Sequence, residues 1–400
     1  MKAVILAAGE GQRMRPLTAN RPKVMLPVGG KPIVEHLLIE LKEAGINGFV
    51  FVVGYCNKQV RSYFGDGAKW GVSIEYSAQR KQLGTADAIR TAAGVIEGNF
   101  LVINGDVMIN RADIKRLMKS RVDTMSIKQV EDPRGLGIVE LADGKVINIW
   151  EKSQNPPTLM ANTGVYLFTP AVFKAIDQTE KSPRGEYEIT DSLKILMKSK
   201  KGLRSLEIKT WVDLSYPWDL LRANEAMMPG MTAETLGEVE PGVTIKGPVS
   251  IGRNTVVKAG SYIEGPVIIG EDCRIGPNCY IRGCTTIGND CHIGAAVELK
   301  NSIIMNHTAV PHLNYVGDSV IGEGCNFGAG TKIANLRLDK KNIIINGIDT
   351  RRRKLGAIVG DNVQTGINTS INVGTIIGSN TCIGPGAVVK GAISPDSRIF

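Results

Sequence analysis

A loop near the start of the chain combines glycines with cationic side chains. The apolar run 3–5 leads into LAAGEGQRMRPLTANRPK, residues 6–23. Backbone amides of such a loop can cradle phosphate oxygens, and Arg13 and Lys23 could neutralise their charge. The loop lacks the G-K-[ST] of a Walker A motif, and Met14 stands where the dinucleotide fingerprint has its third glycine. The loop therefore predicts a phosphate site outside those two classes.

The composition is that of a soluble globular protein, and its positive charge is compatible with anionic partners of any size. Of 400 residues, 43% are apolar and 22% are charged, and no apolar stretch approaches the ~18 residues of a membrane span. We therefore expect a cytoplasmic protein without a membrane partner. The formal charge is +9, but the longest basic run, 351–354, has no interleaved aromatic residues for base stacking. This absence argues against a nucleic-acid partner.

The first 228 residues alternate segments typical of strands and helices. Strands are expected at 2–8, 48–54, 72–77 and 100–104, and helices at 32–44 and 85–93. Repeated βαβ units predict an α/β, Rossmann-like fold with a mostly parallel sheet covered by helices. Ligands of such sheets bind at the carboxyl ends of strands, where the glycine loop and NGD, 104–106, both lie.

After Pro229 the period of the sequence becomes six. Large apolar residues recur every six positions from Ile245 to Leu299, and the series restarts at Ile321 and at Ile371. Glycine follows many of these positions, which a helix or a long strand does not explain but a hexapeptide β-helix does. Small residues two positions earlier, including four of the seven cysteines, are then interior fillers. The pattern predicts domains at 1–228 and 229–400.

Two stretches, 300–316 and 335–355, break the six-residue register. Loops that interrupt a solenoid lie on its surface and commonly carry function. The first stretch contains His307, His312 and Tyr315, and the second contains the basic run.

Several motifs resemble, in order, those of the sugar-1-phosphate nucleotidylyltransferases. They are LAAGEGQRM…RPK, QLGTADA (82–88), INGD (103–106), Glu151-Lys152 and NTG (162–164). With the hexapeptide half added, the whole chain resembles the GlmU-type bifunctional enzymes, which join a uridylyltransferase to a glucosamine-1-phosphate N-acetyltransferase. The resemblance implies a nucleotidyltransferase domain followed by a left-handed parallel β-helix of hexapeptide repeats. It also implies a homotrimer with acetyl-transfer sites between neighbouring β-helices.

For the first domain the resemblance implies attack of a sugar-1-phosphate on the α-phosphorus of UTP or dTTP, with release of pyrophosphate. Arg13 and Lys23 are the expected catalytic residues, and Asp106 and Asp213 are the expected ligands of Mg²⁺. The expected nucleotide contacts are Leu6, Ala8, Gly9, Gln79, Gln82, Gly84 and Thr85. The expected sugar-phosphate contacts are Gly137, Glu151, Lys152 and Asn162. The segment RMRPLTANRPK departs toward glucose-1-phosphate thymidylyltransferases, so use of both nucleotides stays open, because one methyl discriminates by only ~1–3 kcal/mol.

For the second domain the resemblance implies N-acetylation of glucosamine-1-phosphate, or of galactosamine-1-phosphate, by acetyl-CoA. Only an unprotonated amine attacks a thioester, and a histidine with an ordinary pKa near 6.5 suits the general base. PHLNYVGD, 311–318, resembles the motif that places this base at His312. The expected contacts to the amino-sugar phosphate are Arg282, Lys300, Tyr315, Asn326 and Asn335. A serine of the family aligns with Ile367, so the residues that bind CoA stay unassigned.

Two other interpretations remain open. One is a monofunctional glucose-1-phosphate thymidylyl- or uridylyltransferase with a structural β-helix, against which His312 and Tyr315 argue. The other is a non-enzymatic regulatory subunit of the translation-factor exchange type, which shares both folds. Such a subunit has no need to keep Lys23, Asp106 and His312 together.

Overall fold

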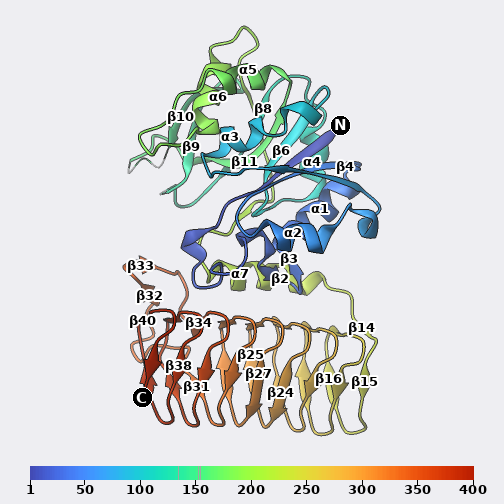
Figure 1. Ribbon diagram of the computed structural model, residues 1–400, viewed down its shortest axis with the longest axis vertical. Helices are drawn as coiled ribbons and strands as arrows, with labels where there is room; N and C mark the ends of the chain where they lie inside the picture. The colour runs from blue at the N-terminus through green and yellow to red at the C-terminus, as the bar shows by residue number, and fades with distance from the viewer. Residues whose placement is uncertain (134, 152, 154) are drawn as a thin grey trace. The chain divides into compact units, whose positions relative to one another are not determined.

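The computed structural model describes residues 1–133, 135–151, 153 and 155–400 (Figure 1). Lys152, expected at the sugar phosphate, lies outside the described residues. Contacts between residues divide the chain into two compact units. Unit 1 comprises Met1–Glu10, Arg21–Met25 and Ile33–Asp213, and unit 2 comprises Gly11–Asn20, Leu26–Pro32 and Leu214–Phe400.

Unit 1 is built on a sheet with the strand order β5-β4-β1-β6-β11-β8-β12-β10-β9. The first four in this order are parallel: β5 (Ser73–Ala78), β4 (Gly48–Val53), β1 (Lys2–Ala7) and β6 (Phe100–Asn104). Their sequences are largely apolar, as in GFVFVV of β4, which suits strands covered on both faces. The accompanying helices are α1 (Ile33–Glu43), α2 (Asn57–Phe64), α3 (Thr85–Arg90) and α4 (Arg111–Leu117). This half confirms the predicted βαβ units, although α3 ends earlier than expected.

The other half of the sheet is largely antiparallel, so the prediction of a mostly parallel sheet is wrong there. Its strands are β11 (Met160–Phe168), β8 (Thr124–Gln129), β12 (Arg204–Glu207), β10 (Lys145–Glu151) and β9 (Gly137–Ala142). β11 runs antiparallel to both β6 and β8, and β9 runs antiparallel to β10. Asp143 and Gly144 connect β9 to β10 with positive φ angles, the geometry of a tight hairpin turn. Two helices, α5 (Ala171–Asp177) and α6 (Ile189–Met197), complete this half.

Unit 2 contains three sheets of short parallel strands, and successive strands join the three sheets in turn. The first sheet runs from β14 (Glu234–Thr235) to β40 (Ala392–Ile393), the second from β15 (Glu238–Val239) to β41 (Arg398–Ile399), and the third from β16 (Thr244–Lys246) to β39 (Val388–Val389). Paired residues in many neighbouring coils are three repeats apart, as Ile251 is from Ile269. Figure 1 shows the coils stacked side by side, an arrangement consistent with a parallel β-helix.

The six-residue series forms the interior of these coils, as predicted. Ile263, Ile275 and Ile281 have no exposed surface, and the preceding small residues Cys273 and Cys279 are at most 1% exposed. All seven cysteines are free thiols. Ile245 is 38% exposed, because its strand lies at the open end of the third sheet and only β19 (Tyr262–Glu264) covers it.

The first predicted interruption, 300–316, is not a surface loop. It forms three further strands, β26 (Ile303–Ile304), β27 (Ala309–His312) and β28 (Tyr315–Gly317). These strands join the first, second and third sheets, and Ile304 and Val316 are buried inside. Each coil turns at corners between its successive strands. Two of these corners are one residue shorter than the others, because Ile304 comes five residues after Leu299 and Ile321 comes five after Val316. The register shifts, but the coils continue.

The second predicted interruption, 335–355, is an insertion, as expected. β32 (Ile344–Ile345) and β33 (Ile348–Asp349) form an antiparallel hairpin, and Leu336 bridges to Lys354 at its base. The third sheet continues past it, since β31 (Lys332–Ile333) pairs directly with β36 (Ser370–Ile371). The α-helix α7 (Asp219–Met227) precedes the coils within unit 2. No helix among the described residues has both the length and the apolar character to span a membrane.

Candidate functional site

The carboxyl end of β1 carries the first residues of the glycine loop, 8–10, which belong to unit 1. The Ala8 carbonyl accepts hydrogen bonds from the Tyr55 amide (3.0 Å) and from Gln82 Nε2 (2.9 Å). A Cβ placed on Gly9 would meet no atom within 4 Å, so the backbone there borders open space. Arg13 belongs to unit 2, in the short 3-10 helix Gln12–Met14, and is therefore not among the residues that unit 1 itself brings together.

Lys23 and Asp106 meet beside the end of β6. Lys23 Nζ donates to Asp106 Oδ2 at 2.5 Å, and both side chains are partly buried. The preceding Gly105 is held against β1, because its amide donates to the Leu6 carbonyl at 2.9 Å. A Cβ on Gly105 would lie 2.9 Å from that same oxygen, so glycine is required for this approach.

Asp213 lies on the strand next to Asp106. β13 (Val212–Asp213) pairs antiparallel with β7 (Val107–Met108), which places Asp213 opposite Val107. The carboxylates of Asp106 and Asp213 are hard oxygen donors, and Mg²⁺ commonly takes one or two protein carboxylates plus phosphate and water oxygens. Across the residues that the structure describes, no three His, Cys, Asp or Glu side chains are grouped as a metal cage. The donor set therefore fits Mg²⁺ that is bound together with a phosphate.

The turn after β5 is fixed by the residues expected to contact the nucleotide. Gln79 is 6% exposed, and its Nε2 donates to the Gly84 carbonyl (3.0 Å) and to Asp87 Oδ2 (2.9 Å). Gly84 has a φ of +103°, and a Cβ there would lie 2.5 Å from the Tyr187 carbonyl oxygen. The Thr85 hydroxyl accepts a hydrogen bond from the Ile189 amide at the start of α6 (2.9 Å). In this structure these residues shape the turn.

Gly137, Glu151 and Asn162 are close together. Gly137 pairs with Glu151 across β9 and β10, and a Cβ on Gly137 would lie 3.1 Å from Glu151 Oε2 and 3.7 Å from Asn162 Cβ. The Asn162 amide group donates to the Tyr166 hydroxyl at 2.8 Å. Burial raises the pKa of that hydroxyl, which stays protonated at neutral pH. Arg184, which the sequence did not single out, lies with its guanidinium 3.9 Å from Glu151 Oε1.

A contact between strands joins this sugar group to the Asp106 group. Gly164 of the NTG motif, on β11, has a φ of +73°, and a Cβ there would collide with the Asn104 side chain. Asn104 ends β6, two residues before Asp106. Unit 1 thus brings the INGD and NTG motifs together where β6 and β11 lie side by side in the middle of its sheet.

In unit 2, Arg282 and Lys300 lie in equivalent places on neighbouring coils. β22 (Tyr280–Ile281) pairs with β25 (Glu298–Lys300), and the Arg282 amide donates to the Leu299 carbonyl at 2.9 Å. Arg282 Nη1 donates to Glu298 Oε1 at 3.2 Å. Lys300 Nζ donates to the buried Asp318 Oδ2 at 3.0 Å, and the lysine side chain is 18% exposed.

Tyr315 and Asn335 lie next to Lys300. Asn335 Nδ2 donates to the Tyr315 hydroxyl (3.1 Å) and to Asp318 Oδ2 (2.6 Å). A Cβ on Gly317 would lie 2.6 Å from the Tyr315 hydroxyl oxygen and 2.7 Å from Asn335 Nδ2. The absence of a side chain at Gly317 therefore provides the space in which both groups lie. Burial raises the pKa of Tyr315, although Lys300 opposes this shift, and the hydroxyl therefore remains a donor at neutral pH.

His312 ends β27, at the corner that leads to Tyr315. It is exposed, it pairs with Ala295 of the preceding coil, and its carbonyl accepts a hydrogen bond from the Gly330 amide (3.0 Å). Asn326, also expected at the site, begins the next strand of the same sheet, β30 (Asn326–Phe327). His307 precedes β27, at the opposite corner, with its Nδ1 2.9 Å from Asp290 Oδ2. The structure therefore separates the two histidines by a strand.

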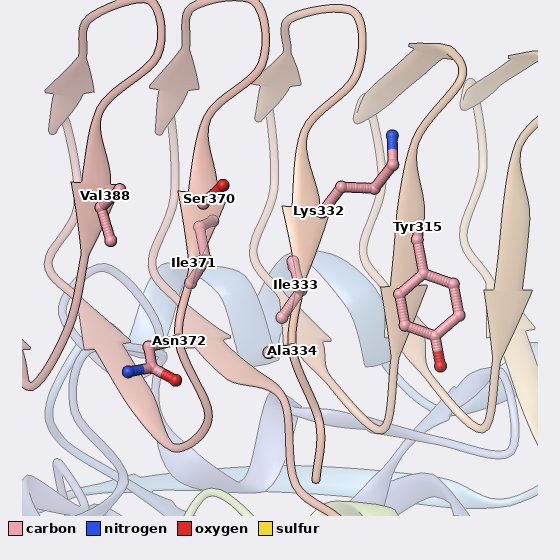
Figure 2. Close-up of a pocket in the computed structure, with 8 residues that line it drawn as sticks. All are labelled: Tyr315, Lys332, Ile333, Ala334, Ser370, Ile371, Asn372 and Val388. Atoms are coloured by element: carbon pink, nitrogen blue, oxygen red, sulfur yellow. The ribbon is translucent and has the colours of Figure 1, made fainter. Parts of the chain in front are cut away.

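A groove extends from Tyr315 along the third sheet. It encloses about 420 Å³ and is lined by Tyr315, Lys332, Ile333, Ala334, Ser370, Ile371, Asn372 and Val388. These residues lie on or directly after neighbouring strands of the third sheet, β28, β31, β36 and β39. Figure 2 shows the Tyr315 ring at one end of the row and Val388 at the other. The sequence did not reveal this groove, because its residues come from separate coils on both sides of the insertion.

Comparisons with known proteins identify the family. The nucleotidyl transferase family matches residues 2–229, and the GMPPB C-terminal domain matches residues 263–376. A bifunctional protein GlmU from Methanococcus maripaludis (strain S2) is 43% identical over 407 residues, covering 100% of this chain and 97% of that protein. The chain belongs to the GlmU-type bifunctional family. This finding confirms the resemblance noted in the sequence.

Other relatives agree with the GlmU-type assignment. A bifunctional sugar-1-phosphate nucleotidylyltransferase/acetyltransferase from Sulfurisphaera tokodaii is 38% identical and covers 98% of this chain and 97% of its own length. A solved structure described as a glucose-1-phosphate thymidylyltransferase from Bacillus anthracis is similar with a TM-score of 0.52 and 32% identity. It covers 56% of this chain and 94% of its own. The GlmU-type chain therefore contains a Rossmann-like nucleotidyltransferase domain.

Proposed function

We propose that this GlmU-type chain catalyses two reactions of UDP-N-acetylglucosamine synthesis. Glucosamine-1-phosphate is N-acetylated by acetyl-CoA, and UMP is then transferred from UTP to the sugar-1-phosphate with release of pyrophosphate. Galactosamine-1-phosphate and dTTP are further candidate substrates. The main support for this proposal is that relatives of the bifunctional type match the chain from end to end. In addition, each unit has its own cluster of polar side chains, around Asp106 in unit 1 and around Lys300 in unit 2.

We place the two activities in residues 1–228 and 229–400. We also propose that the coils form a left-handed β-helix, that three chains associate through it, and that the protein is cytoplasmic. A coil has flat sides and offers little enclosure, so a neighbouring chain would complete an acetyl-transfer site. This assembly is the family expectation, and gel filtration with light scattering would test it.

In the first reaction, positioning and charge neutralisation do most of the work. A sugar-1-phosphate oxygen forms a bond to the α-phosphorus while the bond to the pyrophosphate oxygen breaks. Lys23 would neutralise the triphosphate, and Arg13 has the same proposed role from the glycine-loop motif. Leu6, Ala8 and Gly9 would line the nucleotide with backbone groups, together with the turn 79–85.

The sugar phosphate of this reaction would lie near Glu151 and Asn162. Their closeness to Gly137 and, through Gly164, to the end of β6 supports this placement. Asp106 and Asp213 would hold Mg²⁺, which when bound neutralises phosphate charge. Lys152 is proposed as a further contact from the motif alone.

In the second reaction, His312 is the proposed general base. It would accept a proton from the substrate amine as nitrogen attacks the thioester carbonyl carbon. The carbon–sulfur bond then breaks, and the CoA thiolate leaves and takes up a proton. Arg282 and Lys300 would hold the sugar phosphate, and Tyr315, Asn326 and Asn335 would donate hydrogen bonds to sugar or carbonyl oxygens.

The groove beyond Tyr315 is the proposed place for part of acetyl-CoA. Its apolar residues, including Ile371 and Val388, suit a pantetheine chain, and Lys332 supplies a positive charge for a phosphate. The groove begins beside Tyr315, so a thioester at that end would be near the amine.

A product assay tests the whole proposal. Full-length protein is incubated with glucosamine-1-phosphate, acetyl-CoA, UTP and Mg²⁺, and each component is omitted in turn. Thiol release should require the amino sugar and acetyl-CoA only, whereas pyrophosphate release should require UTP, Mg²⁺ and a sugar-1-phosphate acceptor. Pyrophosphate release without any thiol release would refute the second activity and favour a structural β-helix.

A further inference from the structure

A buried carboxylate joins the residues expected to bind the amino-sugar phosphate. Asp318 follows β28 and is 2% exposed. Its Oδ2 accepts hydrogen bonds from Lys300 Nζ (3.0 Å) and Asn335 Nδ2 (2.6 Å), and its Oδ1 accepts one from Asn301 Nδ2 (2.8 Å). Lys300 and Asn301 belong to the preceding coil and Asn335 to the following one, so Asp318 ties three coils together at one corner.

The same chain of contacts reaches a helix outside the coils. Asn301 Nδ2 also donates to Glu225 Oε1 on α7, at 2.7 Å. Glu225 accepts from both terminal nitrogens of Arg352, at 2.5 and 3.3 Å. Arg352 belongs to the insertion 335–355 and its side chain is 16% exposed. Paired hydrogen bonds between a guanidinium and a carboxylate are strong and directional, so Glu225 is held firmly.

We propose that Asp318 and Glu225 are positioning residues for acetyl transfer, which fix the Lys300 ammonium and the Asn335 amide where the sugar phosphate binds. This inference rests on the proposed acetyltransferase function. Neither carboxylate contacts the substrate. Donors that are ordered before the substrate arrives lose less conformational freedom on binding, and this lowers the concentration of substrate needed.

The charge of Asp318 has two effects of opposite sign. As an anion near a phosphate, it weakens binding by repulsion. As an anchor, it strengthens binding by holding Lys300 and Asn335 in place. Lys300 lies 3.0 Å away and compensates most of the repulsion at a distance, whereas loss of the anchor frees two side chains that touch the substrate. We therefore expect the anchoring effect to dominate.

The test compares full-length wild-type protein with Asp318→Asn and Glu225→Gln, both close in shape to the native residues. Thiol release gives kcat and the KM values for glucosamine-1-phosphate and acetyl-CoA. The KM for the amino sugar should rise about tenfold in Asp318→Asn, as expected for weakened hydrogen bonds to a charged group. It should rise by about threefold in Glu225→Gln, because Glu225 acts two contacts further from Lys300, through Asn301 and Asp318. The KM for acetyl-CoA and the rate of NDP-sugar synthesis should not change.

Asp272 supplies a matched control at another turn of the coils. Like Asp318 it has a positive φ, and its Oδ1 accepts a hydrogen bond from Asn254 Nδ2 of the preceding coil at 3.0 Å. Asp272→Asn makes the same change of charge outside the Asp318 contacts. Its KM for glucosamine-1-phosphate should stay at the wild-type value, and an equal rise there would overturn the specific role of Asp318.

A double-mutant cycle separates positioning from a general structural role. If Asp318 acts through Lys300, the KM rise in Lys300→Ala combined with Asp318→Asn should be smaller than the product of the two single rises. A rise equal to that product would overturn the inference. So would an unchanged or lower KM in Asp318→Asn.

Different results would refute the acetyltransferase function and the positioning role of Asp318 and Glu225. Wild-type protein that releases no thiol would refute the acetyltransferase function itself. If Asp318→Asn does not fold, which loss of NDP-sugar synthesis and of the thermal unfolding transition would show, Glu225→Gln decides alone. An unchanged KM in that variant would then overturn the inference.

Discussion

Replacement of His312 by alanine should abolish most acetyl transfer without affecting the fold. The side chain is exposed at the end of β27, and the hydrogen bond from Gly330 is made to its backbone carbonyl, which alanine keeps. The free energy of unfolding should therefore change by less than about 0.5 kcal/mol, as for ordinary surface sites. A general base contributes about 10²–10⁴-fold to the rate, or ~2.7–5.4 kcal/mol of barrier.

The assay is thiol release from acetyl-CoA with glucosamine-1-phosphate, with NDP-sugar synthesis from N-acetylglucosamine-1-phosphate as an internal control. Wild-type acetyl transfer should fall on the acid side, because the substrate amine takes up a proton there and only the unprotonated amine attacks the thioester. Raising the pH should partly restore the rate of His312→Ala, because more of the amine is then already unprotonated.

His307 provides the matched control. It is 63% exposed and lies beside Asp290, at the other end of β27. His307→Ala should retain nearly full acetyl transfer. Full activity in His312→Ala together with loss in His307→Ala would show that the base is misassigned, and full activity in both would refute histidine base catalysis in this domain.

Three other changes test separate parts of the structure. Asp106→Asn should nearly abolish NDP-sugar synthesis and leave acetyl transfer near wild type; loss of both activities would contradict the assignment and indicate misfolding. Gly317→Ala should reduce acetyl transfer by about tenfold or more, because its Cβ would lie 2.6 Å from the Tyr315 hydroxyl oxygen. A wild-type rate in this variant would refute that steric reasoning. Burial is the main cause that lowers the pKa of His292, and the nearby charges of Arg274, His312 and Lys258 lower it further. The unfolded chain therefore binds a proton at this histidine more readily than the folded chain as the pH falls, and the folded state loses stability. His292→Gln should therefore lose less stability between about pH 7.5 and about pH 5 in urea unfolding, and an identical loss in both proteins would argue against the shift.

The six-residue period predicted the interior of the coils well, since each repeat places one large side chain inside. It failed at 300–316 because a corner can be shortened without disturbing the stack. At ordinary corners a residue three places after the interior one has a positive φ, as Asp290 has after Ile287. At the two short corners the positive φ comes one place earlier, at Asn301 and Asp318. Asparagine and aspartate suit both kinds of corner, so composition does not distinguish them.

The motifs named several residues that the structure brings together, such as Lys23 with Asp106 and Tyr315 with Asn335, but not the bonds among them. Asp318 stands inside the motif PHLNYVGD, yet nothing in the sequence indicates that it accepts from three side chains. Glu225 lies 76 positions before Asn301, and only folding brings them together. Arg184 was missed because a single exposed arginine has no spacing signal.

The hydrogen bonds of Asp318 connect three consecutive coils, and this limits where whole coils can be added to the chain or removed from it. A solenoid can gain or lose a whole coil of about 18 residues wherever neighbouring coils are alike, because each coil needs only the two beside it. Between Lys300 and Asn335 such a gain would separate partners by one extra coil spacing, about 4.8 Å, and break the contacts at Asp318. A coil added before Ile263 would leave the Asp318 contacts in place, but the segment between α7 and the first coil would then have to span one more coil spacing to keep Glu225 on Asn301. The length of that segment therefore sets how far the early part of the stack can be lengthened, by evolution or by design.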